Sequence, residues 1–326
     1  MLLSYGFSNN CIYIPLHLNT IFFQGEINFE KDYVNLSLVE SIFEEVSKTK
    51  AKYYFLDFCR IKMTESRVFE IFADILSSTE KTIIFVNLNN RISNFIHNAD
   101  CYGLVIYDKT KTALSNHIGI EFIDSIGNYQ EYIIDYKKKI IGLYVKEIVI
   151  MEEQFLESSS VYSNMYVDIK KIFNNRKMYS LIIYELCNLV VTHFNKRFDA
   201  LVSSSNNGSA LSTIIGKILN KDVLYLMNLG PHLTIRDKEL LNSIIPKKRY
   251  LFIYDFICLG TEFKITKTVV NTKDADLVGA VGVAKYRFED RENKHKVFSL
   301  IDINTDCNLS YEVYFEKREH IEAGEG

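Results

Sequence analysis

The chain has 326 residues, of which 48% are hydrophobic and 24% are charged, as in ordinary globular proteins. Its formal net charge of −3 excludes a global basic field that would attract nucleic acid or an anionic membrane surface. No apolar run reaches the roughly 18 residues that a membrane-spanning helix needs, and the length suffices for two domains with cores of their own.

The cysteines and the amino terminus indicate a cytoplasmic protein. The six cysteines are scattered and include no C-x-x-C pair, which favours reduced thiols over disulfides or a zinc site. Residues 1–11 lack a basic stretch followed by an apolar block, so a secretory signal is not expected.

Strand and helix patterns alternate over residues 1–125, which predicts a small α/β domain with a mostly parallel sheet. Thr64 is a candidate N-cap. The expected strands are 20–27, 52–58, 82–88 and 103–107, and the expected helices are 36–48, 64–76 and 91–97.

In this domain, the segment L-D-F-C-R-I-K-M-T-E-S places an acid at a strand end and hydroxyl residues at the next helix start. It resembles the central part of STAS domains, in which Asp57, Thr64 and Ser66 would be the matching positions. The resemblance implies a module through which the protein acts on a protein partner. A generic α/β unit is the alternative, because any strand–Asp–helix turn has this pattern.

Residues 126–154 are expected to connect two domains. Strand-like composition at 129–136 and 143–151 flanks the basic run 137–139, which is most simply a solvated turn. The basic run 247–249 is interpreted as a turn as well. The steering of a phosphate-bearing ligand is the alternative for either run.

Residues 155–326 have the alternating pattern of a second α/β domain with an open parallel sheet. A long amphipathic helix is expected at 177–195, with His193 on the surface near its end. The expected strands are 199–205, 223–227, an apolar run from 250, 276–284, 297–303 and 309–315, and further helices are expected at 210–219 and 262–270.

Two strand–loop–helix turns in this domain have the composition of phosphate-binding loops. In the first, the tight loop 206–209 (N-N-G-S) follows a strand, and Gly208 permits close backbone approach. In the second, a strand runs to Asp255, and a short loop closes on Gly260 before a helix. The first N–H groups of a helix lack intrahelical partners and carry partial positive charge, so each turn can hold an anion. An acid beside such a loop can accept hydrogen bonds from sugar hydroxyls, so a sugar phosphate is the expected ligand.

The second turn, Y-D-F-I-C-L-G-T at 254–261, resembles the ribose-phosphate signature of type I phosphoribosyltransferases. That family has two adjacent acids, two apolar residues and a loop rich in Thr and Gly. Asp255 matches the second acid, whereas Tyr254 replaces the first acid and Cys258 replaces the first loop threonine. The resemblance implies that Asp255 holds a ribose, and Tyr254, in the place of the first acid, is a candidate substrate-binding residue. The positions that it assigns to the 5-phosphate are Cys258, Gly260, Thr261 and Glu262.

The upstream segment 155–171 resembles the opening of orotate phosphoribosyltransferases, in which a Ser, a Tyr and an Asp on a strand precede a basic residue. The matching positions are Ser158, Ser159, Ser163, Tyr166, Asp168 and Lys170. The same resemblance assigns the pyrophosphate of phosphoribosyl pyrophosphate to Ser205, Asn206, Asn207, Gly208 and Ser209. An edge hairpin and an ordinary Asn-Gly turn are the respective alternatives.

Where orotate enzymes carry an Arg-Lys pair, this chain has Asn228-Leu229. The candidates for a loop that closes over the substrate are His232, Arg236 and Lys238, with a solvated surface loop as the alternative. Tyr286 and Phe288 are candidates for stacking on a base, with core packing as the alternative.

The resemblance implies phosphoribosyl transfer from phosphoribosyl pyrophosphate, with Mg²⁺ carried by the substrate and no metal-ligand set on the protein. Asp255 would hold the ribose, and Lys170 or Lys238 would stabilise the leaving group. A non-catalytic nucleotide sensor that controls a protein partner is the alternative, because Tyr254, Asn228 and Leu229 depart from the family. Hydrolysis of a nucleotide at the same site is a third hypothesis. A homodimer is expected, without a nucleic-acid or membrane partner.

Overall fold

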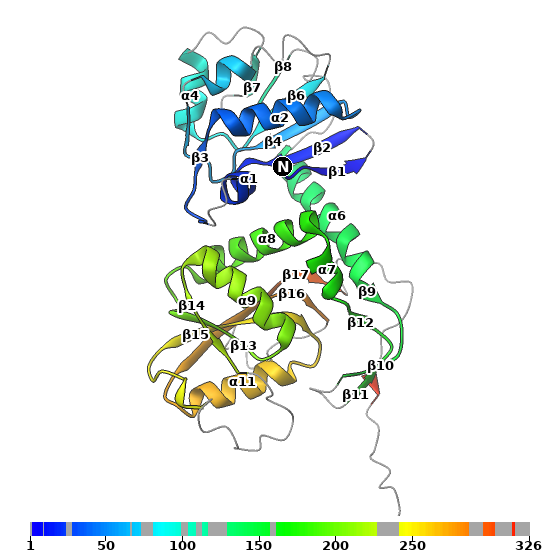
Figure 1. Cartoon of the computed structure of the whole chain (residues 1–326), viewed down its shortest axis with the longest axis vertical. Coiled ribbons are helices and arrows are strands. Elements are labelled where there is room, and N and C mark those ends of the chain that lie inside the picture. The colour runs from blue at the N-terminus through cyan, green and yellow to red at the C-terminus, as the bar shows by residue number, and fades with distance from the viewer. Residues whose placement is uncertain are drawn as a thin grey trace, which may run out of the picture. The chain divides into compact units, whose positions relative to one another are not determined.

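The structure is a computed structural model. The residues that it describes are 2–8, 10–23, 28–65, 67–72, 81–98, 104–108, 113–116, 129–156, 161–226, 241–286, 296–303 and 315–316. The chain divides into two compact units, Met1–Ile140 and Ile141–Gly326 (Figure 1). The domain limits expected from the sequence, 1–125 and 155–326 with a connecting segment at 126–154, stay a prediction.

The N-terminal unit contains a six-stranded sheet with the strand order β1-β2-β4-β6-β8-β7. Its strands are β1 (Tyr5–Ser8), β2 (Cys11–Pro15), β4 (Tyr53–Asp57), β6 (Thr82–Val86), β7 (Leu104–Asp108) and β8 (Ala113–Asn116). The central strands β2, β4 and β6 are parallel, whereas β1 on one side and β8 and β7 on the other pair antiparallel. The sheet expected to be mostly parallel is therefore parallel only at its centre.

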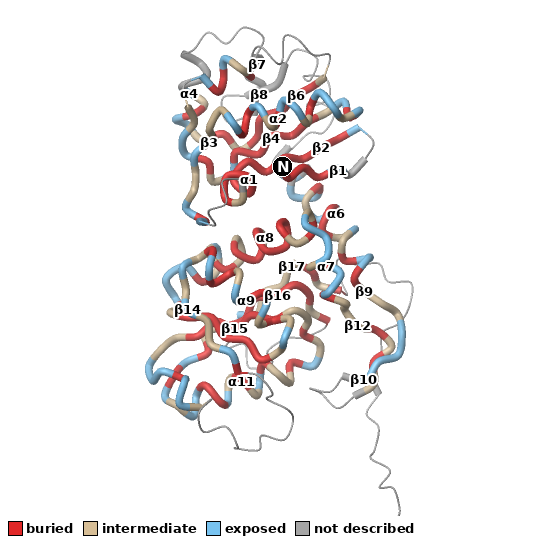
Figure 2. The backbone as a smooth tube through the Cα atoms, viewed as in Figure 1, coloured by how far each residue is buried: buried red, intermediate tan, exposed pale blue. Residues whose placement is uncertain are grey.

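Helix α2 (Leu36–Lys48) packs on this sheet and has the bounds expected from its sequence period. Its first turn is capped by Asn35, whose side chain accepts a hydrogen bond from the Leu38 N–H at 3.0 Å. Its buried stripe is Leu38, Val39, Ile42 and Val46, which joins the same core as the strand residues Leu56 and Phe85 (Figure 2). The remaining elements are α1 (Leu16–Phe23), α4 (Asn90–Asn98), the first part of α6 (Tyr129–Ile148), and the short parallel pair β3 (Tyr33–Val34) and β5 (Met63–Thr64).

The expected strand at 20–27 is wrong, because helix α1 occupies 16–23. Leu16, Leu18 and Ile21 are all buried, so this short helix shows no alternation of polar and apolar faces from which to recognise it. Thr64 is not a helix N-cap either. It lies in β5, and the helix that follows is described at 68–72.

The two strands and the solvated turn expected around 137–139 are also wrong, because α6 runs unbroken from Tyr129 to Ile148. Lys137 lies on this helix beside the carboxylate of Asp57, with its Nζ 3.3 Å from Oδ2. Asp57 is buried and also accepts hydrogen bonds from the Tyr13 hydroxyl at 2.6 Å, the Asn87 amide at 2.7 Å and the Cys59 N–H at 2.9 Å. Burial alone would raise the pKa of Asp57, but these partners together hold it below its ordinary value. The basic run thus supplies a partner for a buried acid.

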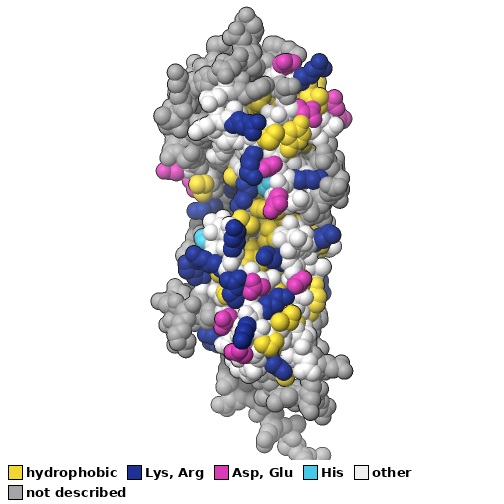
Figure 3. Space-filling model, turned by 90° about the vertical axis from the view of Figure 1, so that its left-hand side faces the viewer, with side chains coloured by type: hydrophobic (Ala, Val, Ile, Leu, Met, Phe, Trp, Pro, Cys, Tyr) yellow, Lys and Arg dark blue, Asp and Glu magenta, His cyan; other side chains and the backbone are white. Residues whose placement is uncertain are grey.

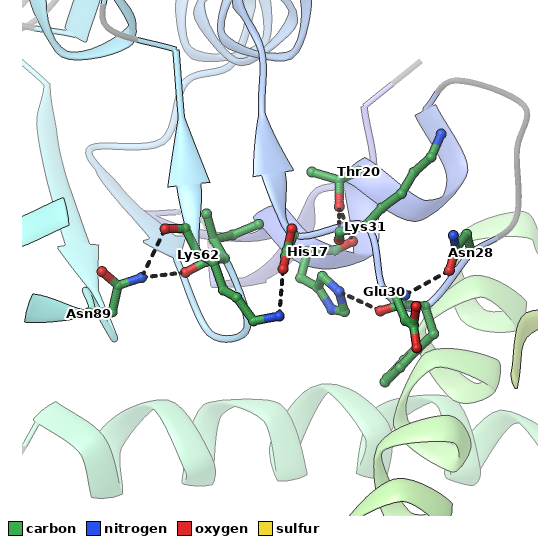
Figure 4. A network of polar contacts seen from close by, with 10 residues as sticks. His17, Thr20, Asn28, Glu30, Lys31, Lys62 and Asn89 are labelled. Atoms are coloured by element: carbon green, nitrogen blue, oxygen red, sulfur yellow. Dashed lines mark hydrogen bonds and ion pairs between the residues drawn. The ribbon is translucent and has the colours of Figure 1, made fainter. Parts of the chain in front are cut away.

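A polar network at the carboxyl end of β2 surrounds His17, which is 2% exposed (Figure 4). Its Nε2 lies 3.0 Å from the backbone carbonyl of Phe29. Because a carbonyl can only accept, Nε2 carries the proton in this contact. Thr20 donates to the carbonyls of His17 and Lys31, at 2.8 and 3.0 Å. Burial, together with the positive charge of Arg60, lowers the pKa of His17 from 6.5 to about 4.

We expect the free energy of unfolding to fall as the pH is lowered from about 6.5 to about 4, by up to about 3 kcal/mol. In this window the unfolded chain binds a proton at His17 and the folded chain does not, so acid favours unfolding. Urea unfolding at several pH values measures the slope, and His17→Gln, which can still donate to Phe29, is the comparison. Equal slopes in the two proteins would contradict the assignment.

The C-terminal unit contains a five-stranded parallel sheet with the order β14-β13-β15-β16-β17. Its strands are β13 (Ala200–Ser203), β14 (Asp222–Tyr225), β15 (Arg249–Ile257), β16 (Asp276–Lys285) and β17 (Lys296–Asp302). Helices α8 (Arg176–Phe194) and α9 (Asn206–Leu219) cover one face, and α11 (Thr261–Asn271) covers the other (Figure 1). The expected open parallel sheet is therefore confirmed in the described strands.

Side chains of the central strand β15 alternate between these two layers from Tyr250 to Asp255. Phe252 and Tyr254 belong to the core beneath α11 and contact each other through their rings. The carbonyl of Ile253 lies against Gly208 of α9, and Asp255 bonds to Asn207 of the same helix. Because side chains of a strand point to opposite faces in turn, neighbouring positions 254 and 255 serve different layers.

The segment 155–171, together with its flanks, forms small pieces beside this sheet. Its elements are β9 (Val149–Ile150) with β12 (Tyr166–Val167), β10 (Gln154–Leu156) with β11 (Val161–Ser163) and β18 (Phe315–Glu316), and the short helix α7 (Lys170–Asn174). The antiparallel pair β10–β11 has the form of the edge hairpin named above as the alternative.

In the part of the chain that the structure describes, no helix is long and apolar enough to cross a membrane. On the face shown in Figure 3, basic and acidic side chains are interspersed and do not gather by sign. This distribution agrees with the small net charge of the sequence.

Candidate functional site

The candidate site lies at the carboxyl ends of the neighbouring strands β13 and β15. Both strands point the same way, so each delivers its following helix, α9 or α11, to the same edge of the sheet. Open α/β sheets bind their ligands outside the carboxyl ends of the strands. Two helix starts, each with N–H groups that no intrahelical carbonyl can reach, are thereby brought to neighbouring positions.

The carboxylate of Asp255 bonds to the start of α9. Its Oδ2 accepts a hydrogen bond from the Asn207 amide at 3.0 Å, and its Oδ1 lies 3.5 Å from the Ser205 hydroxyl. Ser205 is the N-cap of α9, and its hydroxyl also accepts from the Gly208 N–H at 3.0 Å. Asp255 is half-buried. The structure therefore brings together the acid and the loop that sequence reasoning placed in one site.

The loop expected at 206–209 has a different local structure. Asn206 begins α9, so these residues form its first helical turn, and the connection from β13 consists of Ser204 and Ser205. Ser205 has an extended backbone, and its side chain accepts a hydrogen bond from the Gly208 N–H as a helix N-cap. The helix therefore starts earlier than the composition of 206–209 indicated. The structure thus has a helix start where the sequence predicted a loop.

Gly208 is required by close packing. A Cβ at this position would lie 2.9 Å from the Ser205 hydroxyl oxygen and 3.0 Å from the Ile253 carbonyl oxygen. The first turn of α9 can therefore approach β15 only without a side chain here. The contact fixes the distance between Asn207 and Asp255.

We expect Gly208→Ala to lower the free energy of unfolding by up to about 2 kcal/mol. Overpacking costs about 1–3 kcal/mol, and the better helix propensity of alanine offsets about 1 kcal/mol. Urea unfolding measures the change. Gly142→Ala on α6 is the control, because a Cβ there meets nothing within 4 Å and should stabilise by roughly 0.5–1 kcal/mol. Equal stabilisation by both variants would show that the contact is not tight.

The start of α11 carries its own acid. Gly260 is the N-cap, with φ of 70°, a left-handed conformation that glycine adopts without strain. Glu262 lies in the first turn, and its Oε2 accepts a hydrogen bond from the Ser204 hydroxyl at 3.2 Å. Burial raises the pKa of the Cys258 thiol to about 11, and the negative charge of Glu262 adds to the shift. Cys258 is thus a neutral thiol at neutral pH.

Tyr254 is not brought to this cluster. It is 2% exposed, and its hydroxyl donates to the backbone carbonyl of Phe298 on β17 at 2.8 Å. Its ring lies on Gly282, where a Cβ would come within 2.2 Å of the ring. Burial raises the pKa of Tyr254 far above its ordinary value. The side chain acts as core, and the prediction that it binds substrate draws no support from these contacts.

Lys170, one of the two candidate lysines, is not joined to Asp255 by any contact among the described residues, and Lys238 lies outside them. The Lys170 side chain is exposed, and its backbone N–H bonds to Asp168 at 3.2 Å at the start of α7. Ser163 is buried and bonds to the Met165 backbone, as in a turn. Several predicted positions lie outside the described residues: Ser66, Ser158, Ser159, Asn228, Leu229, His232, Arg236, Lys238 and Phe288.

The basic run 247–249, Tyr286 and His193 make contacts within the fold. The basic run 247–249 lies at the amino edge of the sheet, opposite the site, where Arg249 pairs with Asp199 and Lys248 with Asp222 at 2.7 and 2.9 Å. These contacts do not favour phosphate steering. Tyr286 is buried. His193 is half-buried in the last turn of α8 and stacks on Phe298, with ring centroids 3.8 Å apart, so only part of its side chain is at the expected surface.

Sequence reasoning missed Ser204, which links the start of α11 to the end of β13 through Glu262. The run of three serines at 203–205 was the available signal, because a strand has no need of consecutive hydroxyls. It also missed Lys285 and Asp302, whose side chains lie 3.6 Å apart at the carboxyl ends of β16 and β17. Within the described residues, no three His, Cys, Asp or Glu side chains gather to hold a metal ion.

Comparison with known proteins gives fold-level matches to solved structures. The orotate phosphoribosyltransferase of Aeropyrum pernix is 16% identical, and the match covers 51% of this chain and 96% of that one, with a TM-score of 0.40. That of Mycobacterium tuberculosis H37Rv, in complex with Fe(III) dicitrate, is 16% identical over 53% and 99%, with a TM-score of 0.40. The adenine phosphoribosyltransferase of Saccharomyces cerevisiae is 16% identical over 49% and 98%, with a TM-score of 0.37.

No protein-family model matches the chain, and no curated protein matches it. The three solved structures named above are orotate and adenine phosphoribosyltransferases, and each match covers about half of this chain. At this identity and TM-score, the matches assign no function to the residues at the sheet edge. The STAS resemblance of the N-terminal unit stays a prediction.

Proposed function

We propose that the C-terminal unit binds phosphoribosyl pyrophosphate, or a ribose-5-phosphate nucleotide, at the edge between β13 and β15, and that it transfers the phosphoribosyl group to a base. One observation carries the proposal. Asp255 is bonded to the start of α9 by Asn207 at 3.0 Å, and Ser204, which precedes the N-cap of α9, bonds to Glu262 in the first turn of α11 at 3.2 Å, so the two helix starts on neighbouring parallel strands meet beside the acid. This arrangement suits a sugar with an anionic group at each end.

Each part of the ligand has a chemical counterpart in this arrangement. The start of α9 offers backbone N–H groups to pyrophosphate, and the start of α11 offers them to the 5-phosphate. Asp255 keeps lone pairs for ribose hydroxyls beyond those used by Ser205 and Asn207, because each carboxylate oxygen accepts about two hydrogen bonds. Its negative charge also favours a transition state with positive charge on the sugar.

Mg²⁺ fits these residues as an ion carried by the substrate. The oxygen donors of Asp255 and Ser205 are of the hard type that Mg²⁺ prefers, although they are too few to form a protein cage. When bound, Mg²⁺ would neutralise charge on the pyrophosphate as it leaves. Asp255 would orient the ribose, and the first turn of α9 would hold the leaving group.

Binding without turnover is the second candidate function, and the position of Tyr254 favours it. The place of a first acid is taken by a tyrosine whose hydroxyl is used by Phe298 and whose ring is buried. One carboxylate is then left to hold the ribose diol. A sensor of this kind would signal the presence of nucleotide to a protein partner, which would bind the N-terminal unit. In this proposal the protein acts as a homodimer.

Two measurements on the full chain test the proposal. Calorimetry with phosphoribosyl pyrophosphate and Mg²⁺ should show saturable binding, and its absence from folded protein would refute both functions. Pyrophosphate release across a panel of purine and pyrimidine bases then separates them. Release with one base supports transfer, whereas binding without release from any base supports a sensor.

A further inference from the structure

The side chain of Asn207 holds the carboxylate of Asp255. Its amide nitrogen lies 3.0 Å from Oδ2 of Asp255, and because a carboxylate can only accept, the amide donates this hydrogen bond. The contact from the Ser205 hydroxyl to Oδ1 is 3.5 Å long, which is longer than an ordinary hydrogen bond between oxygens. Of these two contacts, the one from Asn207 therefore does more to orient the acid.

The backbone around Asn207 is itself held in place. Two hydrogen bonds close the turn that contains it: the Gly208 N–H donates to the Ser205 hydroxyl at 3.0 Å, and the Ser209 N–H donates to the Ser205 carbonyl at 2.8 Å. Gly208 lies so close to β15 that a Cβ would come 3.0 Å from the Ile253 carbonyl oxygen. The fold thus presents the Asn207 amide to the acid from a fixed turn.

We propose that Asn207 is a positioning residue, which acts on the sugar through Asp255 and does not itself bind the pyrophosphate to which the family resemblance assigns it. This inference rests on the proposed function, because it assumes that Asp255 binds a ribose. A carboxylate with a fixed plane meets the ribose hydroxyls without losing rotational freedom on binding. The same carboxylate, free to rotate, would bind those hydroxyls more weakly.

Asn207→Ala tests this role by its dependence on the ligand. We expect the full chain with this substitution to bind ribose 5-phosphate at least about fivefold more weakly and pyrophosphate within about twofold of the wild type, as measured by calorimetry. An equal or larger loss for pyrophosphate would show that Asn207 contacts pyrophosphate itself, and would overturn the inference.

Thr213→Ala is the matched control for Asn207→Ala. Thr213 is exposed on the same helix, and its hydroxyl lies 2.8 Å from that of Tyr225 on β14. Its loss removes a polar contact of α9 without touching the acid, so both affinities should stay unchanged. A loss as large as that of Asn207→Ala would show that binding follows the stability of α9, and would count against a positioning role.

Asn207→Asp supplies a readout that a purely structural role would not move. An acid in the first turn of a helix is favourable, so the variant should stay folded. Its carboxylate would lie against Asp255, and two carboxylates in contact share a proton at acid pH but repel each other when both are ionised. Relative to the wild type at the same pH and without Mg²⁺, the affinity for ribose 5-phosphate should fall by about tenfold at about pH 8 and by less than about threefold at about pH 5. Glu262, which Ser204 holds at this edge, is present in both proteins and cancels in the ratio.

Thr213→Asp adds a carboxylate farther along α9 and should show no such pH dependence. The inference is overturned if the affinity ratio for Asn207→Asp is the same at both pH values, or if Asn207→Ala binds ribose 5-phosphate as tightly as the wild type. Should Asn207→Ala lose its thermal transition, Asn207→Asp decides alone. Failure of the proposed function looks different: the wild type and Thr213→Ala, both folded by thermal melting, would bind neither ribose 5-phosphate nor phosphoribosyl pyrophosphate.

Discussion

Tyr254→Asp should destabilise the protein by about 4 kcal/mol or more and should not create a more active transferase. The substitution restores the acid pair of the family signature in sequence, but position 254 points into the core beneath α11. It removes a ring that packs on Gly282 and Phe252, and it leaves a carboxyl group in that cavity. Loss of a large buried side chain costs about 3–5 kcal/mol, and burial of the carboxyl group adds to it. Urea unfolding measures the effect.

Tyr254→Phe separates the ring from the hydroxyl. It keeps the packing and loses only the hydrogen bond to Phe298, so it should cost about 1 kcal/mol. A stable Tyr254→Asp protein with faster pyrophosphate release would show that position 254 faces the ligand, and would count against the proposed division of layers along β15.

Asp255→Asn should weaken binding of phosphoribosyl pyrophosphate with Mg²⁺ by about tenfold or more, and Asp255→Ala should abolish it. The asparagine loses the charge that favours Mg²⁺ and the ribose hydroxyls, and a hydrogen bond to a charged group contributes about 1.5–3 kcal/mol. Both variants should stay folded, because Asp255 is only half-buried and bonds to neutral partners.

Calorimetry gives the affinities, and Asp276→Asn, at the amino end of β16 on the opposite edge of the sheet, controls for the loss of one negative charge. If Asp255→Ala binds as tightly as the wild type, the ligand does not lie between α9 and α11. If both Asp255 variants lose their thermal transition, the acid has a structural role, and Ser205→Ala, which removes its weaker contact, becomes the better test of binding.

Local patterns predicted the elements that carry the site. The helical period of its apolar residues predicted helix α2. Apolar runs predicted strand β13, which precedes Ser204, and strand β15, which contains Asp255. The pattern gave a wrong prediction for α1, which is buried on all sides. It also gave a wrong prediction for α6, a long helix whose polar and apolar residues do not separate onto two faces. Such segments lack the periodicity that distinguishes helix from strand.

By itself, the sequence determined that a strand ends near Asp255, that a helix starts after Gly260, and that a second helix follows the strand at 200–203. It predicted the start of that second helix at 210, whereas the structure has it at Asn206. These features depend on local backbone preferences, which neighbouring residues set. Only the tertiary structure decided that Asp255 faces α9 while Tyr254 faces the core, and that Ser204 holds Glu262. Strand order and helix packing join residues 48 to 58 positions apart, and no local pattern encodes which side of the sheet each helix will cover.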